Sequence, residues 1–453
     1  MGEPFLKGRG KPVAAAVPET GVVAALTHEA EGVIRGGKTV FVSGALPGEE
    51  VRFVRTRRHR QHDEGRLLEV LTASTERVTP RCAHFGVCGG CALQHLVPDA
   101  QLAAKQAELR DNLECIAHVL PETWFEPIRS PPWNYRRRAR LGAKFVTKKG
   151  RVVVGFRERL APYVAALDRC EVLAAPVGEL IAPLSALFTD LSIRERLPQI
   201  EVAVADNATA LVLRVLVPPS EADLAKLREF ETVHGVRFYL QPGGIDSVRP
   251  LTEGGELPPL LYRHPRFDIE LEFAPTDFVQ VNGPVNAILV ERAVELLDPG
   301  PDSSVLDLFC GLGNFTLALA RRAGRVVGVE GEAGLVRRAE ANARRNGIDN
   351  AEFHVADLVK EASDLPPWAR NPYSHVLLDP PRAGAREMLP TVARLGPKAV
   401  LYISCHPGSL ARDIGMLVEA YGFSLRAAGV VDMFPHTTHV ESLALLTPPT
   451  HRS

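Results

Sequence analysis

The stretch "SSVLDLFCGLGNFTLALARRAGRVVGVEG", residues 303–331, decides the fold class. It runs from a short apolar segment through a glycine turn and a helix-like segment into a second apolar segment. This pattern predicts two parallel strands joined by a crossover helix. The alternation continues through "AEFHVAD" (351–357), "SHVLLDPP" (374–381) and "KAVLYISC" (398–405). Residues 276–453 therefore predict an α/β domain whose parallel sheet is covered by helices on both faces.

Acidic residues stand near the carboxyl ends of four predicted strands: Asp307, Glu330, Asp357 and Asp379. Open parallel sheets bind their ligands at that edge. The turn has Thr316 where a dinucleotide-binding fingerprint would have its last glycine, and no Walker lysine follows. We therefore expect a cofactor with a ribose and a cationic centre, and S-adenosylmethionine fits that description better than NAD.

A thiol ends the apolar run in "AVLYISCHPGSL", residues 399–410. Pro407 cannot continue a β-ladder, so Cys405 should lie at the ligand-binding edge of the sheet. The N-terminus of the helix predicted to follow should stabilise a thiolate there. A buried inert thiol is the alternative interpretation. The favoured interpretation is a nucleophile.

A thiolate beside a methyl donor suggests methylation at C5 of a pyrimidine. Addition of the thiolate to C6 makes C5 nucleophilic, and a base must then remove the C5 proton. Glu441 enters an apolar strand in "HVESLALL" (439–446), where burial should raise its pKa as a base requires.

Short β-runs separated by glycines over residues 21–75 predict a small barrel, after a loose tail at 1–20. Residues 76–275 predict a mixed α/β central domain. The formal net charge is −1, so affinity for nucleic acid must come from local basic patches. One candidate patch has no intervening acid and comprises Arg52, Arg55, Arg57, Arg58 and Arg60. These arginines predict a phosphate-facing surface rather than a solvated edge strand.

A second basic run occupies residues 136–151, with Tyr135 and Phe145 interleaved. RNA contact and a plain solvated sheet face both remain open for it.

Three cysteines cluster in "CAHFGVCGGCALQH", residues 82–95, as Cys82, Cys88 and Cys91. We expect no signal peptide and no membrane span, hence a reducing cytoplasm, where clustered cysteines indicate a metal rather than disulfides. Zinc usually takes paired C-x2-C knuckles and only one is present, so an iron–sulfur cluster is favoured over zinc. Cys115 and Cys310 are interpreted as core thiols.

Five motifs, taken in order, resemble the RNA (uracil-5)-methyltransferase family: "FVQVN" (278–282), "DLFCGLGNFTL" (307–317), "LDPPRAG" (378–384), "YISCHP" (402–407) and "HVES" (439–442). The similarity is greatest to the bacterial 23S ribosomal RNA branch. It implies a class I (Rossmann-like) methyltransferase domain at 276–453, an OB-like TRAM barrel at 21–75 and a [4Fe-4S] cluster in the domain at 76–275.

The resemblance also assigns residues. Cys405 falls on the nucleophile and Glu441 on the proton-abstracting base, and Arg382 would lie beside the target base. Cys170, in "LDRCEVL", would be the fourth cluster ligand. His406 stands where the family usually has Asn, which leaves the pH dependence of this site open. The family's S-adenosylmethionine contacts fall on Gln280, Phe309, Asn314, Glu330, Asp357 and Asp379.

The implied activity is methylation of uridine C5 in 23S ribosomal RNA by a monomeric cytoplasmic enzyme that binds no membrane. Two alternatives remain. One is the same chemistry on transfer RNA, and the other is an RNA-binding assembly factor without catalysis, against which the intact Cys405 and Glu441 argue.

Overall fold

The computed structural model describes residues 11–12, 17–251, 258–360 and 366–449. Most of the tail predicted at 1–20 therefore lies outside the described residues. The chain divides into two compact units. The first comprises Met1–Ala104 and His436–Thr438, and the second comprises Lys105–Pro435 and His439–Ser453.

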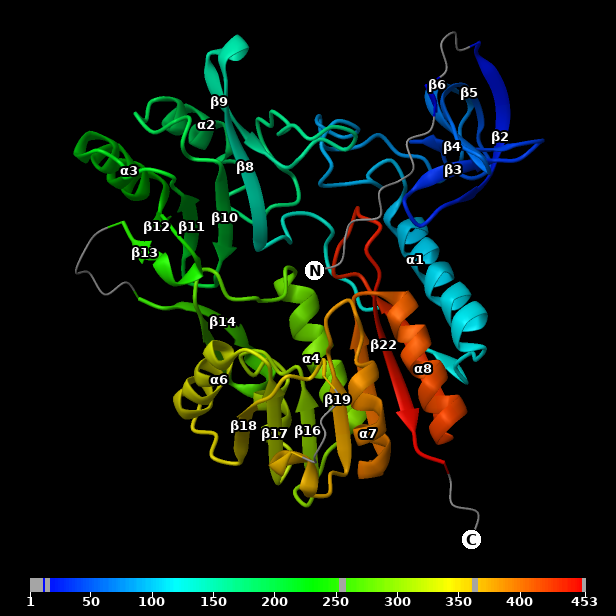
Figure 1. Cartoon of the computed structure of the whole chain (residues 1–453), viewed down its shortest axis with the longest axis vertical. Coiled ribbons are helices and arrows are strands. Elements are labelled where there is room, and N and C mark those ends of the chain that lie inside the picture. The colour runs from blue at the N-terminus through cyan, green and yellow to red at the C-terminus, as the bar shows by residue number, and fades with distance from the viewer. Residues whose placement is uncertain (1–10, 13–16, 252–257, 361–365, 450–453) are drawn as a thin grey trace. The chain divides into compact units, whose positions relative to one another are not determined.

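The first unit contains the predicted barrel, shown in blue in Figure 1. Its strands are β2 (Glu19–Leu26), β3 (Glu31–Ile34), β4 (Thr39–Ser43), β5 (Glu50–Arg58) and β6 (His62–Thr72). They pair in the order β5–β2–β3–β4–β6, and β6 pairs again with β5, so the sheet closes on itself. The two-residue strand β1 (Lys11–Pro12) pairs with Arg57 and Arg58 at the end of β5, beyond the residues of β5 that pair with β2. Alternate side chains such as Val40, Val42 and Phe53 fill the barrel core.

A long helix, α1 (Pro98–Asn112), follows the barrel and ends in a π-helical turn at Leu113–Ala117. Cys115 lies in this turn and is exposed, so its interpretation as a core thiol was wrong. The α-helical periodicity of the sequence does not predict the face on which Cys115 lies, because the wider π-helical turn rotates its residues relative to an α-helix.

The second unit contains a six-stranded sheet in the order β13–β12–β11–β10–β8–β9. The strands are β8 (Arg138–Val146), β9 (Arg151–Gly155), β10 (Gln199–Val204), β11 (Thr209–Arg214), β12 (Val236–Gln241) and β13 (Arg249–Pro250). Helices α2 (Ile181–Thr189) and α3 (Glu221–His234) accompany it. Ser220 and Asp223 form a capping box at the start of α3. The hairpin β14 (Leu260–His264) and β15 (Ile269–Phe273) leads into the last part of the chain.

That last part forms an eight-stranded sheet in the order β18–β17–β16–β19–β20–β22–β21–β7. Its strands are β7 (Thr123–Trp124), β16 (Ser304–Leu308), β17 (Arg325–Glu330), β18 (Ala351–Val355), β19 (His375–Leu378), β20 (Ala399–Ser404), β21 (Ser424–Val431) and β22 (Glu441–Thr447). Its helices are α4 (Gly283–Leu297), α5 (Thr316–Ala320), α6 (Ala333–Arg345), α7 (Leu389–Leu395) and α8 (Pro407–Tyr421). In Figure 1, β18, β17, β16 and β19 lie side by side.

The pairing of this sheet differs from the prediction at one edge. Strands β16 to β20 are parallel, as expected, but β22 pairs antiparallel with both β20 and β21. The chain passes β20, forms β21 further out and returns through β22 between them. This return places Glu441, the first residue of β22, opposite Val431 and next to the end of β20.

Candidate active site

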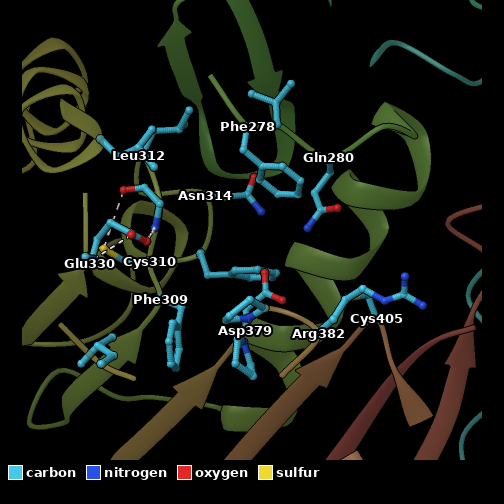
Figure 2. A pocket seen from close by; sticks show the side chains of 18 of the residues that line it. Phe278, Gln280, Phe309, Cys310, Leu312, Asn314, Glu330, Asp379, Arg382 and Cys405 are labelled. Atoms are coloured by element: carbon cyan, nitrogen blue, oxygen red, sulfur yellow. Dashed lines mark hydrogen bonds between the residues drawn. The ribbon is translucent and has the colours of Figure 1, made fainter. Parts of the chain in front are cut away.

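A pocket of about 590 Å³ opens at the carboxyl ends of β16 to β20. Figure 2 shows it from close by. All eight side chains predicted to catalyse or to bind the cofactor line it: Gln280, Phe309, Asn314, Glu330, Asp357, Asp379, Cys405 and Glu441. Arg382 lines it as well. In Figure 2, Glu330 lies at one end of the pocket, Arg382 and Cys405 lie at the other, and Asp379 lies between them.

The turn after β16 bends sharply around the pocket. Phe309 has a φ of 66° although it is not glycine, and its N–H donates to the carbonyl of Val329 at 2.8 Å. Left-handed backbone at a non-glycine residue is strained and is held in place by its surroundings. Gly313 has a φ of 95°, and a Cβ there would lie 3.2 Å from Leu317. The glycine at this position therefore permits both the turn and its close packing against α5.

Asp307 has a structural role that the sequence did not reveal. It is fully buried within β16, and its Oδ2 accepts from the hydroxyl of Thr316 at 2.5 Å. Burial raises the pKa of Asp307 to about 7, although the Thr316 hydrogen bond opposes this. The expectation that Asp307 faces the ligand was wrong, because it lies inside the strand and anchors the turn. Thr316 stands where a dinucleotide-binding fingerprint would have glycine, and its hydroxyl donates to this carboxyl group.

Glu330 presents a fixed carboxylate to the pocket. Its Oε1 accepts from the N–H groups of Gly331 at 2.7 Å and Glu332 at 3.1 Å, and its Oε2 accepts from Gly311 at 3.1 Å. A carboxylate has about four acceptor positions, and three are occupied, so Glu330 can also accept a hydrogen bond from one hydroxyl group of a ribose. Glu330 thus links the end of β17 to the glycine turn and remains available to a ligand.

Asn314 is held by a hydrogen-bond network that motif analysis missed. Its Oδ1 accepts from Tyr262 at 3.1 Å, from His264 at 3.0 Å and from Asn286 at 2.9 Å. Its Nδ2 donates back to Asn286 at 3.0 Å. Burial lowers the pKa of His264, so the neutral ring donates through Nε2. The available sequence signals were weak. Tyr262 and His264 are polar residues of β14, and Asn286 is a polar residue among the apolar buried residues of α4.

Asp357 lies at the rim of the pocket. Lys360 approaches its carboxylate at 2.8 Å and holds the pKa of Asp357 below its ordinary value, and the N–H of Val359 donates to it at 3.2 Å. Leu358 beside it lines the pocket, together with Leu312 and Leu335. Apolar side chains flanked by carboxylates form a slot suited to a flat base with a ribose attached.

Cys405 ends β20 within a cluster of charges. Burial, Glu441 and Asp379 raise the pKa of Cys405 to about 11, and Arg382 opposes them. The expectation that the N-terminus of α8 stabilises a thiolate was therefore wrong for the ligand-free site, because desolvation and two carboxylates outweigh the helix. The resting group is a thiol that becomes nucleophilic when it loses its proton.

Glu441 is 3% exposed, and burial followed by the charge of Asp379 raises its pKa well above the ordinary value. The predicted rise in pKa is confirmed. Burial also raises the pKa of Asp379 to about 7. A carboxylate with a raised pKa is a stronger base than an ordinary carboxylate.

His406 caps α8. Its Nδ1 accepts from the N–H of Ser409 at 3.1 Å, and its backbone is extended, as an N-cap residue requires. Burial and the charges of Arg382 and Arg412 lower the pKa of His406, so the ring is neutral and can accept this bond. Asn is a favoured N-cap residue for the same reason. The difference from the family at this position is thus an exchange of one helix cap for another.

Helix α8 also positions the loop that carries Arg382. The hydroxyl of Ser409 donates to the carbonyl of Arg382 at 3.0 Å. The N–H of Ala385 donates to the buried Asp413 at 2.8 Å, and the hydroxyl of Tyr402 donates to the same oxygen at 2.6 Å. One helix therefore fixes both the backbone next to Cys405 and the segment on which Arg382 stands.

The basic run on the barrel is only partly available to a ligand. Arg52 pairs with Glu69 at 2.8 Å, and Arg55 pairs with Glu19 at 2.8 Å and Asp63 at 2.7 Å. The expectation that these two arginines lack counter-charges was wrong, because their partners lie on neighbouring strands. The remaining arginines are exposed and form no ion pair with any residue that the structure describes: Arg57, Arg58 and Arg60.

The arginines at 136–140 in the second basic run are engaged within the protein. Arg137 pairs with Asp206 at 2.6 Å, and Arg140 pairs with Glu201 at 2.7 Å. Burial lowers the pKa of Arg138. The two aromatic residues of the run, Tyr135 and Phe145, are also engaged. Tyr135 is buried and donates to the carbonyl of Pro435 at 3.0 Å, and Arg194 lies over the ring of Phe145 at 4.8 Å. These contacts do not support an RNA-facing role for the arginines at 136–140, whereas Lys144, Lys148 and Lys149 are exposed.

Three of the predicted cluster cysteines lie in one tightly turned loop of the first unit. Cys88 is buried, while Cys82 and Cys91 are partly exposed. The N–H of Gly90 donates to the sulfur of Cys88 at 3.4 Å, an interaction that stabilises thiolate ligands. Cys170 is buried in the second unit. Among the described residues, no group of three His, Cys, Asp or Glu side chains is arranged to hold a metal ion. The cysteines supply the thiol ligands that an iron–sulfur cluster needs, but their observed arrangement does not form a metal site.

Among the helices that the structure describes, none combines the length and the apolar character that crossing a membrane requires.

The profile of the family described as tRNA (Uracil-5-)-methyltransferase matches residues 267–448. A protein of Alkalilimnicola ehrlichii named 23S rRNA (uracil(1939)-C(5))-methyltransferase RlmD is 50% identical over 424 residues, or 93% of this chain and 95% of that protein. A protein of Stenotrophomonas maltophilia with the same name gives the same identity and coverage.

Among solved structures, the chain resembles a tRNA (uracil-54, C5)-methyltransferase of Pyrococcus abyssi in complex with S-adenosyl-L-homocysteine. The TM-score is 0.72 at 24% identity, and the match covers 95% of this chain and 100% of that one. This likeness confirms the predicted fold class, in which a class I methyltransferase domain follows a small barrel and a mixed α/β segment.

Proposed function

Because the chain belongs to the RNA (uracil-5)-methyltransferase family, we propose that it methylates C5 of a uridine in 23S ribosomal RNA. S-adenosylmethionine, when bound, supplies the methyl group. The observation that carries the proposal is a pocket that holds Glu330 at one end and Cys405 and Arg382 at the other. Glu441 lines the same pocket beside the end of β20, close enough to act on the charge of Cys405. The relatives are named for uracil 1939, so the equivalent uridine is the first target to test.

The residues of the pocket suit S-adenosylmethionine. The carboxylate of Glu330 can accept a hydrogen bond from a ribose hydroxyl, and the leucines beside Asp357 can enclose an adenine. Asp379 lies between Glu330 and Cys405, where its charge can attract a sulfonium centre. Gln280, Phe309 and Asn314 complete the proposed contacts.

The catalytic role of each side chain follows from its surroundings. Cys405 loses its proton, and its sulfur forms a bond to C6 of the uracil, which shifts electron density towards C5. Arg382 lowers the pKa of Cys405 and thereby favours the thiolate. After C5 has received its methyl group, Glu441 removes the C5 proton, and the C6–sulfur bond breaks to release the thiolate. The raised pKa of Glu441 makes it a stronger base than an ordinary carboxylate.

The test is to map 5-methyluridine in ribosomal and transfer RNA from a strain that lacks the gene, with and without a plasmid copy. Loss of a single 23S modification that the plasmid restores is expected. Loss of a transfer RNA modification instead would support transfer RNA as the substrate. The description of the matching family profile, which names tRNA, favours that alternative. Unchanged RNA in the deletion strain would leave only the assembly-factor alternative.

The same proposal includes the barrel as a TRAM-type RNA-binding domain and a [4Fe-4S] cluster held by Cys82, Cys88, Cys91 and Cys170. When bound, the cluster would supply structural support rather than chemistry. Anaerobically purified protein is expected to contain iron and sulfide in a ratio close to that of the cluster, and Cys88→Ser is expected to lose both. Stoichiometric zinc without iron would contradict the cluster. A monomeric state and a cytoplasmic location also belong to the proposal.

A further inference from the structure

The outer face of the barrel contains a hollow of about 400 Å³ that the proposed chemistry does not use. Its lining contains both aromatic and acidic side chains, including Phe41, His59, His62, Glu31 and Glu64. A volume of this size accommodates a single nucleotide.

Strand register places these side chains on the outside. Phe41 in β4 lies opposite Glu64 in β6, and Thr39 lies opposite His62. Because side chains alternate along a strand, the neighbouring Val40 and Val42 point into the core while Phe41 points out. The hollow is therefore built partly on strands of the barrel, which carry Glu31, Phe41, His62 and Glu64, and partly on the turns between them.

The rings form a surface on which a flat base can stack. The His59 and His62 rings lie 4.5 Å apart and are inclined by 18°, and the ring of Phe41 lies 5.0 Å from that of His62. Nε2 of His59 lies 2.9 Å from the carboxylate of Glu64, which fixes the imidazole. Stacking of bases on rings of this kind is the usual way in which barrels of this size bind single-stranded nucleic acid.

Charge decides which part of a nucleotide can enter. The carboxylates of Glu29, Glu31 and Glu64 line the hollow and repel phosphate. The exposed Arg57 is paired in register with Glu64, which lines the hollow. A nucleotide can therefore place its base in the hollow and its phosphate beside Arg57.

Carboxylate acceptors select among the four bases. Guanine presents two adjacent donors, N1–H and the N2 amino group, which match the two oxygens of one carboxylate. Uracil presents one N–H between two carbonyl oxygens that a carboxylate repels, and adenine and cytosine each present a single amino group. A carboxylate has about four acceptor positions, so Glu31 can receive such donors in addition to its existing partners.

We propose that this hollow is a subsite for a guanine base in a single-stranded segment of the RNA substrate. The inference rests on the proposed function only in taking RNA as the substrate. Base stacking on Phe41 and His62 would supply affinity, and Glu31 would supply the preference for guanine.

The test uses the full-length protein and three fluorescently labelled RNA heptamers: seven uridines, the same strand with a central guanosine, and the same strand with a central inosine. Anisotropy titrations are expected to give at least tenfold tighter binding for the guanosine strand. Inosine lacks the N2 amino group and should lose most of that preference. Phe41→Ala and Glu31→Gln should bind the guanosine strand no better than the uridine strand.

Leu68→Ala is the matched control, since Leu68 is exposed on β6 but does not line the hollow. It should retain the guanosine preference, and so should Cys405→Ala, whose methylation is abolished. Failure of methylation with a retained preference would therefore count against the proposed function and not against the subsite. Equal binding of the three strands by the wild type, or an unchanged preference in a folded Glu31→Gln, would overturn the subsite.

Discussion

At the scale of single residues, the proposed nucleophile Cys405 and the proposed base Glu441 both have raised pKa values. Cys405 and Glu441 lie close enough to influence one another, and Asp379 acts on both. Each negative charge opposes the formation of another in a buried site. The ligand-free enzyme is thus expected to hold these groups protonated and to become reactive when cationic charge enters the pocket.

This electrostatic coupling predicts how Cys405 responds to pH. Alkylation of Cys405 by iodoacetamide should rise roughly tenfold per pH unit from about pH 7 to about pH 10, because the thiol titrates near 11. Asp379→Asn removes a charge that disfavours the thiolate, so alkylation near pH 8 should become faster. Peptide mass spectrometry measures the modification, with the exposed Cys115 as the internal reference. A rate that is already maximal near neutral pH would contradict the raised pKa.

The raised pKa of Asp379 also makes a prediction about stability. Its pKa is about 7 in the folded protein and close to the ordinary aspartate value of 3.8 in the unfolded chain, so the folded state binds the extra proton between these values. The contribution of this group to stability is therefore present below its unfolded pKa and is lost as pH rises through about 7. Asp379→Asn should melt several degrees higher than the wild type near pH 8 and close to it near pH 4. Thermal melts at both pH values test this, and a lower melting temperature near pH 8 would contradict it.

At the scale of elements, helix α8 organises the reactive end of the pocket. His406 caps the helix directly after Cys405, and Ser409 and Asp413 hold the loop of Arg382. His406→Asn preserves the cap and should leave stability and methylation close to those of the wild type. His406→Ala leaves the N–H of Ser409 without its acceptor and should cost about 1 kcal/mol of unfolding free energy.

Denaturant unfolding and methylation rates of the two variants measure these effects, with Glu419→Gln as a control on the exposed face of α8. If His406→Asn were as inactive as a nucleophile variant, the imidazole would have a chemical role that a cap does not explain.

The elements also show what the sequence could and could not predict. The parallel strands β16, β17, β19 and β20 and the residues at their ends follow from local apolar runs and turn residues, and the motifs correctly indicated the family. The return of β22 between β20 and β21 did not follow, because local periodicity does not encode which strands pair. The Asn314 network was missed for a similar reason, since its four members come from three separate parts of the chain: β14, α4 and the turn after β16.

At the scale of the whole molecule, RNA must be held by few positive charges, because the formal net charge is −1 and many arginines are paired. The sequence overstated both basic runs, because the acids that neutralise Arg52 and Arg55 lie on other strands. The exposed arginines 57, 58 and 60 remain as the phosphate-binding part of the barrel.

Replacing Arg57, Arg58 and Arg60 by Gln should weaken RNA binding and lower the slope of log affinity against log salt by roughly 2, since each single-strand phosphate contact contributes about 0.7. Arg137→Gln with Arg140→Gln should change the slope little, because both arginines are already paired with acids. Filter binding across a salt series distinguishes the two variants. Equal slopes for the wild type and the barrel variant would show that the barrel arginines do not contact phosphate.

The central claim is that Cys405 adds to the uracil and that Glu441 completes the reaction. It is tested most directly by mass spectrometry of denatured mixtures of Glu441→Gln, S-adenosylmethionine and a 23S RNA fragment. Addition and methyl transfer need no base, whereas release of the thiolate requires removal of the C5 proton. Glu441→Gln should therefore accumulate a methylated RNA covalently bound through Cys405, and Cys405→Ala should form neither adduct nor product. An adduct formed by Cys405→Ala, or normal turnover by Glu441→Gln without an adduct, would contradict the account.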